Sequence, residues 1–265
     1  MQTLPHICLL GSGNVATHLA QALTQAGYPI AGIYSRTYEH ACELANKLDT
    51  TPLLTDQVTH LPQADIYIFA VKDHVLPALA ASLAQNPFIP AHALVIHTAG
   101  SMPLETLSQC FAHAAVLYPM QTFSKTTGIS FNQVPLFVEG STPEALEQVQ
   151  QLASRLSRSV TPLSSEGRKH LHLAAVFACN FTNHCYTLAY SLLREAGIQP
   201  ECLLPLIDET ARKVHTTEPA AAQTGPAVRW DCNVMDEHLK ALATHPQLQD
   251  IYRAMSQSIH QTSHD

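Results

Sequence analysis

The residues best suited to chemistry stand near the start of the chain, where a short apolar run ends in two glycines and a small alanine. The order is Gly11-x-Gly13-x-x-Ala16, followed by an amphipathic stretch that ends near Ala26. Gly11 permits a tight turn after a strand, Gly13 lets the backbone approach a phosphate closely, and Ala16 allows close packing of a helix on that strand. Unpaired N–H groups at the helix start would then face an anion. The alternative is an ordinary glycine turn, but the strand and helix predicted on either side favour a dinucleotide site.

The second predicted strand carries the residues that select between the two nicotinamide cofactors. This strand covers residues 28–35 and ends in Ser35-Arg36-Thr37, where an NAD-binding fold usually has an acidic residue. A hydroxyl and a guanidinium suit a 2′-phosphate instead, so NADP is favoured over NAD. The alternative for Arg36 is a solvated arginine at a helix start. The predicted cofactor-binding residues are Gly11, Ser12, Gly13, Asn14, Val15, Ser35, Arg36, Val71, Lys72 and Thr98.

Composition narrows the class of protein. The chain has 265 residues, 46% hydrophobic and only 13% charged, which indicates a sizeable core. Its net charge of −7 argues against a nucleic-acid partner. No apolar stretch is long enough for a membrane span, and the first residues lack a signal-peptide pattern, so we expect a cytoplasmic protein. The seven dispersed cysteines and sixteen unclustered histidines predict neither a redox pair nor a metal site.

Strand and helix patterns alternate through the first 160 residues. Such alternation predicts an α/β fold with a Rossmann-type, doubly wound parallel sheet covered on both faces. From residue 164 the chain reads as helical, so the predicted domains are 1–163, binding NADP, and 164–265, all helical. Strands are predicted at 6–11, 28–35, 52–54, 66–71, 93–97, 114–118, 136–139 and 159–163, and helices at 14–26, 38–48, 75–85, 143–157, 166–196, 200–215, 225–244 and 246–261.

Two sets of residues are candidates for the substrate site. Ligands of an open parallel sheet bind beyond the carboxyl ends of its strands, where His97 ends the fifth strand. On the long helix, His172 or Lys169 suits proton donation, and Asn180 suits orientation of a substrate. His172, Val176, Asn180 and His184 follow i, i+4 spacing and would share one face. The predicted catalytic residues are His172, Asn180 and His97, and the predicted substrate residues are Ser101, Gln121, Thr122 and Arg229.

Each of these assignments has a plainer alternative. His97 also fits a strand-end histidine bonded to the backbone. Polar residues of the long helix also fit helix-to-helix hydrogen bonds at a subunit contact, because a long helix that is apolar around most of its girth needs partners. The helical domain is therefore predicted to form a homodimer. Arg229 fits either a carboxylate clamp or an ion pair with Asp231 or Glu218.

Several short motifs, taken together and in order, resemble a family of Rossmann-like NADP oxidoreductases with a C-terminal helical domain of unknown function. The resemblance covers nearly the whole chain, and the chain is more distantly similar to pyrroline-5-carboxylate reductase, deazaflavin-dependent NADP reductase and the 3-hydroxyacid dehydrogenases. The motifs are Gly-Ser-Gly-Asn-Val-Ala at 11–16, Tyr34-Ser35-Arg36, Val71-x-Asp73, His97-Thr98-x-Gly100-Ser101, Pro119-Met120-Gln121-Thr122-Phe123 and Thr224-Gly225-Pro226-x-x-Arg229-x-Asp231.

The resemblance implies an NADP-binding homodimer with its active site between the two domains. Two residues depart from the family pattern: Lys72 stands where proline is usual, and Trp230 stands where glycine is usual. The hydroxyacid enzymes have a catalytic lysine four residues before an asparagine of the long helix. Here Val176 precedes Asn180 by four residues, so that mechanism does not carry over.

Two functions are consistent with these residues. The first is an NADP-dependent oxidoreductase that transfers hydride between nicotinamide and a small carbonyl, hydroxyacid or imine substrate. The second is a non-catalytic NADP(H)-binding sensor or assembly protein. Turnover of NADPH with candidate substrates distinguishes them, because the second function requires binding alone.

Overall fold

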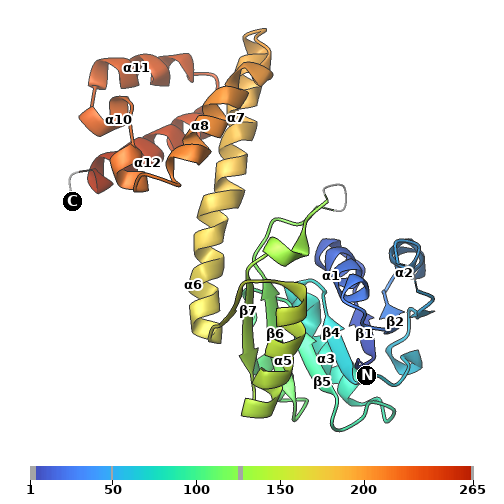
Figure 1. Ribbon diagram of the computed structural model, residues 1–265. Helices are drawn as coiled ribbons and strands as arrows, with labels where there is room; N and C mark the ends of the chain where they lie inside the picture. Colours follow the sequence, from blue (N-terminus) through green and yellow to red (C-terminus); the bar gives the residue numbers. More distant parts are fainter. Residues whose placement is uncertain (1–3, 49, 125–127, 264–265) are drawn as a thin grey trace. The chain divides into compact units, whose positions relative to one another are not determined.

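The chain folds into two compact units, each of which is described by itself. The computed structural model describes residues 4–48, 50–124 and 128–263. The first unit ends at Cys179 and the second begins at Asn180. The first contains a sheet with helices on both faces, and the second is helical (Figure 1). This arrangement confirms the predicted fold class.

An eight-stranded sheet, in the order β3-β2-β1-β4-β5-β6-β7-β8, forms the centre of the first unit as the structure describes it. All neighbouring strands are parallel, as the predicted parallel sheet requires, except β6 and β7, which are antiparallel. Parallel strands need a crossover connection, usually a helix, whereas the described part of the β6–β7 connection contains only the three-residue η3 (Phe131–Gln133). The strands are β1 (Ile7–Leu10), β2 (Ile30–Tyr34), β3 (Leu53–Thr55), β4 (Ile66–Phe69), β5 (Leu94–His97), β6 (Ala114–Pro119), β7 (Leu136–Gly140) and β8 (Val160–Pro162).

Both faces of the sheet are buried, which explains the uninterrupted apolar runs in its sequence. Successive side chains of a strand point to opposite faces, so Ile7 and Leu9 enter one core, with residues of α1 and α5, while Cys8 and Leu10 enter the other, with residues of α3 and α4. The helices of this unit are α1 (Asn14–Gln25), α2 (Tyr38–Ala45), η1 (Val58–His60), η2 (Asp73–Val75), α3 (Leu76–Ala84), α4 (Glu105–Ser108), α5 (Pro143–Leu156) and α6 (Ser165–Ala175).

The long helix predicted at 166–196 contains an irregular turn. It consists of α6, the π-helical turn η4 (Val176–Phe181) and α7 (Thr182–Glu195). A π turn has i→i+5 hydrogen bonds and so takes more residues per turn than an α-helix. The predicted i, i+4 row of His172, Val176, Asn180 and His184 therefore runs through an irregular turn that the prediction of one regular helix did not include.

The helix predicted at 225–244 is also interrupted. α10 (Pro226–Arg229) ends at Trp230, which adopts left-handed φ and ψ angles of 51° and 48°. Asp231 then caps α11 (Cys232–Ala241) by accepting a hydrogen bond from the backbone N–H of Val234. The remaining helices are η5 (Pro200–Leu203), α8 (Leu204–Lys213), α9 (Pro219–Ala222) and α12 (Pro246–Thr262). Among the described residues, no helix has both the length and the apolar character that crossing a membrane requires.

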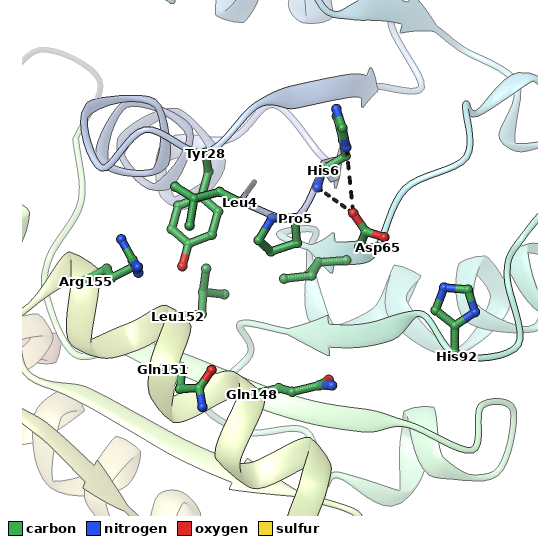
Figure 2. A pocket seen from close by; sticks show the side chains of 11 residues that line it. Leu4, Pro5, His6, Tyr28, Asp65, His92, Gln148, Gln151, Leu152 and Arg155 are labelled. Atoms are coloured by element: carbon green, nitrogen blue, oxygen red, sulfur yellow. Dashed lines mark hydrogen bonds and ion pairs between the residues drawn. The ribbon is translucent and has the colours of Figure 1, made fainter. Parts of the chain in front are cut away.

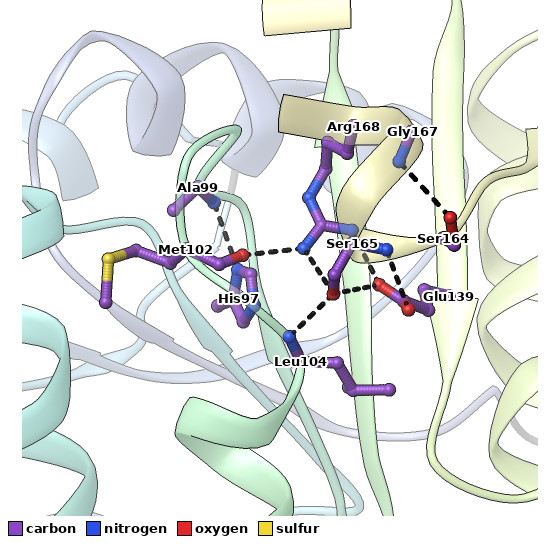
Figure 3. A network of polar contacts seen from close by, with 9 residues as sticks. All are labelled: His97, Ala99, Met102, Leu104, Glu139, Ser164, Ser165, Gly167 and Arg168. Atoms are coloured by element: carbon purple, nitrogen blue, oxygen red, sulfur yellow. Dashed lines mark hydrogen bonds and ion pairs between the residues drawn. The ribbon is translucent and has the colours of Figure 1, made fainter. Parts of the chain in front are cut away.

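A buried ion pair fastens the start of α6 to the sheet unit (Figure 3). Arg168, whose side chain is only 1% exposed, donates from Nη1 to Glu139 Oε2 at 2.7 Å and from Nη2 to the carbonyl oxygen of Met102 at 2.6 Å. Glu139, on β7, also accepts hydrogen bonds from the backbone N–H and hydroxyl of Ser165, at 2.9 and 2.7 Å. The Ser165 hydroxyl in turn accepts from the backbone N–H of Leu104.

The protonation of Glu139 follows from these contacts. Burial alone would raise its pKa, but the hydrogen bonds from Arg168 and Ser165 hold the pKa below its ordinary value. The carboxylate therefore stays charged, and a charged group at the first turn of a helix also compensates the positive end of the helix dipole. The network joins β7, the loop after β5 and α6.

Replacing Arg168 with methionine is expected to lower the free energy of unfolding by up to roughly 3–5 kcal/mol, because the Glu139 carboxylate, whose side chain is only 20% exposed, loses its charged partner. Urea denaturation of the purified protein measures this change. Arg155→Met, which removes an exposed arginine from α5, serves as the matched control and should change stability by about 0.5 kcal/mol or less. An Arg168→Met loss as small as the control's would contradict the anchoring role.

Candidate functional site

The glycine turn after β1 contains two glycines with different roles. Gly11 has a φ of +125°, and a Cβ atom there would collide with the carbonyl of Ala70, approaching its carbon to 2.8 Å. Only glycine tolerates both the backbone angle and the close contact. Gly11 therefore allows the end of β1 to pass against the end of β4, and its contact with a cofactor stays a prediction.

Gly13 faces open space instead. It is the N-cap of α1, with φ −76° and ψ −170°, and a Cβ atom placed there would meet nothing within 4 Å. Among the described residues, no side chain accepts a hydrogen bond from the first turn of α1. The N–H groups at this helix start are thus available to an anion, and the missing Cβ leaves room for one to approach. Ala16, a fully buried residue of α1, packs this helix against the sheet.

The ends of β1 and β2 lie together as the sequence predicted for a dinucleotide site. The hydroxyls of Ser12 and Ser35 are 2.8 Å apart, in hydrogen-bond contact. Arg36 follows Ser35 at the carboxyl end of β2, and its side chain is exposed. Among the described residues Arg36 has no hydrogen bond or ion pair, so its guanidinium is available to a ligand.

The loop after β6 is fastened to α1. Asn14 Nδ2 donates to the carbonyl oxygen of Phe123 at 2.9 Å, and His18 Nε2 is 2.8 Å from the carbonyl oxygen of Ser124. The Asn14 side chain is thus hydrogen-bonded within the protein. The predicted contact of Asn14 with a cofactor would therefore use its backbone N–H. Gln121 and Thr122, predicted to contact substrate, precede these contacts and are exposed. The side-chain oxygen of Gln121 accepts from the backbone N–H of Thr122 at 2.8 Å.

The segments after β4 and β5 meet at the same edge of the sheet. The hydroxyl of Ser101 donates a hydrogen bond to the carboxylate of Asp73. Val71 packs against the core and Lys72 is exposed. Thr98 is buried, and its hydroxyl donates to the carbonyl oxygen of Phe69 at 3.3 Å. Asp73 is therefore a hydrogen-bond partner of Ser101 that the sequence analysis did not predict.

His97 lies inside the protein. It is fully buried, and its Nδ1 accepts a hydrogen bond from the backbone N–H of Ala99 at 3.2 Å. Burial, followed by the positive charge of Arg168, lowers its pKa to about 3. The imidazole is therefore neutral at physiological pH. Its surroundings match the plainer alternative of a strand-end histidine bonded to backbone.

His172 instead contacts a residue that the sequence analysis missed. Its Nδ1 lies 3.1 Å from the hydroxyl oxygen of Tyr118, the last residue but one of β6, and the two rings meet edge to face. Gly100 makes room for this contact, because a Cβ atom there would lie 2.9 Å from both His172 Nδ1 and the Tyr118 ring. In the sequence, Tyr118 is the last residue of a predicted strand, at the sheet edge where ligands bind. That position was the signal that could have identified it as a site residue.

Burial raises the pKa of Tyr118 from its ordinary value, and the nearby charge of Arg168 opposes that rise. The phenol is therefore protonated at neutral pH. Arg168 lies one helical turn before His172, so both side chains occupy one face of α6.

The other predicted site residues belong to the second unit and are described only within it. Asn180 lies in the π turn and is exposed, as is Arg229 at the end of α10. Asp231, one proposed partner of Arg229, caps α11 instead. In the described part of the chain, no three histidine, cysteine, aspartate or glutamate side chains converge to form a metal site.

A pocket of about 550 Å³ lies at the opposite edge of the sheet (Figure 2). It opens at the amino ends of the strands, beside His6, Tyr28 and Asp65, and α5 lines it with Gln151 and Arg155. Ligands of this kind of sheet bind at the carboxyl ends, so this pocket is separate from the candidate site. The N–H groups of α1 and the polar side chains at the carboxyl ends of the strands define the candidate site, and no cavity volume is needed to define it.

Comparison with known proteins places the chain in a family. Residues 6–100 match the family model described as NADP oxidoreductase, coenzyme F420-dependent, and residues 134–259 match the model described as domain of unknown function 2520. A "putative NADP oxidoreductase" from Bacteroides fragilis is 45% identical, with a TM-score of 0.91 over 97% of this chain and 98% of that one. The chain belongs to this family. The predicted resemblance is thereby confirmed, and the family is one that binds NAD(P).

More distant structures share the fold alone. A protein from Thermotoga maritima is 21% identical, with a TM-score of 0.70 over 97% of this chain and 98% of that one. An imine reductase from Myxococcus stipitatus in complex with NAD+ is 17% identical, with a TM-score of 0.61 over 97% of this chain and 93% of that one. The chain has no match among curated proteins.

The two glycines of the turn predict opposite effects of the same substitution. Gly13→Ala should weaken NADPH binding roughly tenfold, about 1.4 kcal/mol, while lowering stability by about 1 kcal/mol or less, because its Cβ enters only the open space at the helix start. Gly11→Ala should lower stability by about 2 kcal/mol or more, because of its positive φ and the collision with Ala70. Calorimetric titration and thermal unfolding measure the two quantities. Equal effects of the two variants on both would contradict this division of roles.

Proposed function

We propose that this protein is an NADP-dependent oxidoreductase that transfers hydride between nicotinamide and a small carbonyl, hydroxyacid or imine substrate. The observation that carries the proposal is the combination of the open helix start at Gly13 with the available guanidinium of Arg36, on the sheet edge that also holds the Tyr118–His172 contact. The first two groups fit a phosphorylated dinucleotide, and the third supplies titratable groups beside it.

The groups that would hold the cofactor are mostly backbone N–H groups and two side chains. The N–H groups of residues 12–15 would bind the pyrophosphate, and Ser35 and Arg36 would bind the 2′-phosphate. Val71, Lys72 and Thr98 are proposed to line the remainder of the cofactor site. When bound, NADPH supplies or accepts the hydride, and the protein must orient the substrate and manage a proton.

The residues that the sequence predicts to bind substrate remain proposals. Those of the first unit lie at the same edge of the sheet. Ser101, with Asp73 behind it, would orient a polar substrate atom, and the exposed Gln121 and Thr122 would contribute further hydrogen bonds. Asn180 and Arg229, which belong to the second unit, remain proposed substrate-binding residues. His172 is proposed to manage the proton.

Steady-state oxidation of NADPH, followed against a panel of keto acids, aldehydes and cyclic imines, tests the proposal. Turnover with at least one class is the expected result. Binding of NADPH without turnover of any panel member would reject the enzyme and favour a sensor or assembly role. Absence of binding of either nicotinamide cofactor by the folded protein would reject both.

Arg36→Gln is expected to lower the affinity for NADPH by roughly 10- to 100-fold and leave that for NADH nearly unchanged, because hydrogen bonds to a charged group contribute about 1.5–3 kcal/mol. Calorimetric titration with each cofactor measures the two affinities. Lys47→Gln, which removes an exposed cation after α2, is the matched control and should change neither. Equal losses for NADPH and NADH would contradict the 2′-phosphate assignment.

We also propose that the protein works as a homodimer through its helical unit. In that unit the buried apolar side chains are Ala227, Met235 and Leu242. The larger exposed ones outnumber them: Phe181, Leu192, Ile198, Leu204, Leu206, Val214, Trp230, Val234, Ile251 and Met255. So much exposed apolar surface is typical of an association surface. A second copy is the occupant proposed, because each helix would then bury its apolar face against a matching one.

Sedimentation measures the oligomeric state directly. The wild-type protein should sediment as a dimer, and the double substitution Leu206→Glu and Met255→Glu should shift it toward monomer, because charges enter the apolar surface. Phe88→Glu is the matched control, since Phe88 is 60% exposed but lies in the sheet unit. A wild-type protein that is monomeric at all concentrations would contradict the proposal.

A further inference from the structure

The Tyr118–His172 contact has two ends with different surroundings. The hydroxyl of Tyr118 is at the inner end, where only about 9% of the residue is exposed. His172 is half-buried, and its second nitrogen, Nε2, forms no hydrogen bond within the described residues. That nitrogen is also not among the buried polar atoms without partners, so it reaches solvent. The pair thus leads from the sheet to the outside of the protein.

The direction of the hydrogen bond decides which ring nitrogen carries a proton. In the described structure, His172 Nδ1 is the only hydrogen-bond partner of the Tyr118 hydroxyl. With this hydroxyl as the donor, Nδ1 is the acceptor. A neutral imidazole has one N–H, which must then be on Nε2. His172 therefore presents an N–H group toward solvent.

We propose that Tyr118 and His172 form a proton relay, in which His172 Nε2–H donates to the oxygen or nitrogen of the substrate's reducible double bond. Tyr118 Oη–H then replaces that proton at Nδ1. The inference rests on the proposed function, because it describes how the proton accompanying hydride transfer is supplied. It adds Tyr118 to the residues of that site.

NADPH, the reductant of the proposed function, would supply the hydride, and the step needs no other reactant. As the substrate carbon accepts hydride, the electron pair of its double bond takes the proton from Nε2, and the Oη–H bond of Tyr118 breaks as an N–H bond forms at Nδ1. The products are the reduced substrate, an imidazole protonated at Nδ1 and a phenolate. A proton from solvent, arriving at Nε2, restores the pair as Nδ1 returns its proton to Oη.

The surroundings of the pair act on this relay in two ways. Burial and the charge of Asp73 disfavour a phenolate at Tyr118, and the positive charge of Arg168 offsets part of that effect. Arg168 also holds α6 to Glu139 one turn before His172, which fixes the distance between the imidazole and the sheet. The geometry needs Gly100 as well, because any side chain there would enter the space of both rings.

The tautomer of His172 can be measured in the cofactor-free protein. Nitrogen NMR of ¹⁵N-histidine-labelled protein distinguishes protonated from unprotonated ring nitrogens, and the signals of His172 are identified by their loss in His172→Gln. We expect Nε2 protonated and Nδ1 unprotonated at neutral pH. In Tyr118→Phe, which keeps the ring but removes the hydroxyl, this preference should be lost. A His172 protonated at Nδ1 in the wild type would overturn the proposal.

Kinetics with a substrate from the panel test the relay itself. Tyr118→Phe should lower kcat roughly 10²-fold, within the range of general acid catalysis, while the Kd for NADPH stays unchanged. Gly100→Ala should also lower kcat, because it separates the pair without changing either side chain. Tyr252→Phe is the matched control: it removes an equivalent bond, from Tyr252 to His238 Nδ1 at 2.9 Å in the second unit, and should leave kcat unchanged.

The failures of the two proposals are distinguishable. If the wild-type protein turns over NADPH and Tyr118→Phe keeps its kcat, the relay is wrong and the oxidoreductase stands. If the wild-type protein turns over no substrate, the proposed function fails, and the relay fails with it. Tyr118→Phe could also lower the affinity for NADPH by the same factor as kcat, or lower the unfolding temperature as well. Either result would assign Tyr118 a structural role and overturn the relay.

Discussion

The buried ion pair between Arg168 and Glu139 is the constraint on which the arrangement of the candidate site depends. A charged arginine that is 1% exposed is unfavourable unless a partner of opposite charge and further acceptors surround it, and Glu139, Met102 and Ser165 meet that requirement. Two of these partners, Glu139 on β7 and Met102 in the loop after β5, lie outside α6, so they fix the place and orientation in which α6 begins. His172, one turn further, acquires its position from that anchor rather than from its own contacts alone.

The same charge governs the ionisation of its neighbours. Arg168 adds to the effect of burial in keeping His97 neutral, and it works against burial at Tyr118. Two titratable side chains at the ends of adjacent strands thus experience one cation in opposite ways, because a positive charge disfavours an imidazolium and favours a phenolate. His97 becomes a neutral core residue and Tyr118 a group whose proton is easier to remove than burial alone would allow.

Much of the fold was predictable because its signals are local. Apolar runs predicted the strands, and the glycine turn with Ala16 predicted the start of α1. The errors have local physical causes too. The π turn at Val176–Phe181 and the left-handed Trp230 interrupt helices whose sequence pattern looks continuous, since hydrophobic spacing does not report backbone angles. The orientation of β7 depends on a connection rather than on the strand's own residues.

The candidate site was only partly predictable, because its decisive contacts join distant segments. Gly13 and Arg36 were recognised since each follows a strand directly. Tyr118 was missed because its hydroxyl gains meaning only from His172, which is 54 residues away in sequence. Glu139 carried a weak signal, as a charged residue ending an apolar strand, but nothing local paired it with Arg168.

Local groups must also decide cofactor binding, because the overall charge opposes it. The chain has a net charge of −7, and NADP is itself an anion. At physiological ionic strength, charges separated by more than about 8 Å are largely screened, which limits the repulsion from distant carboxylates. Within contact distance the unpaired N–H groups of α1 and the guanidinium of Arg36 are positive. An anionic ligand that reaches both the α1 N–H groups and Arg36 is therefore attracted locally, although the net charge of the protein repels it. Such an arrangement favours a ligand with phosphates at two separate positions over one with a single phosphate.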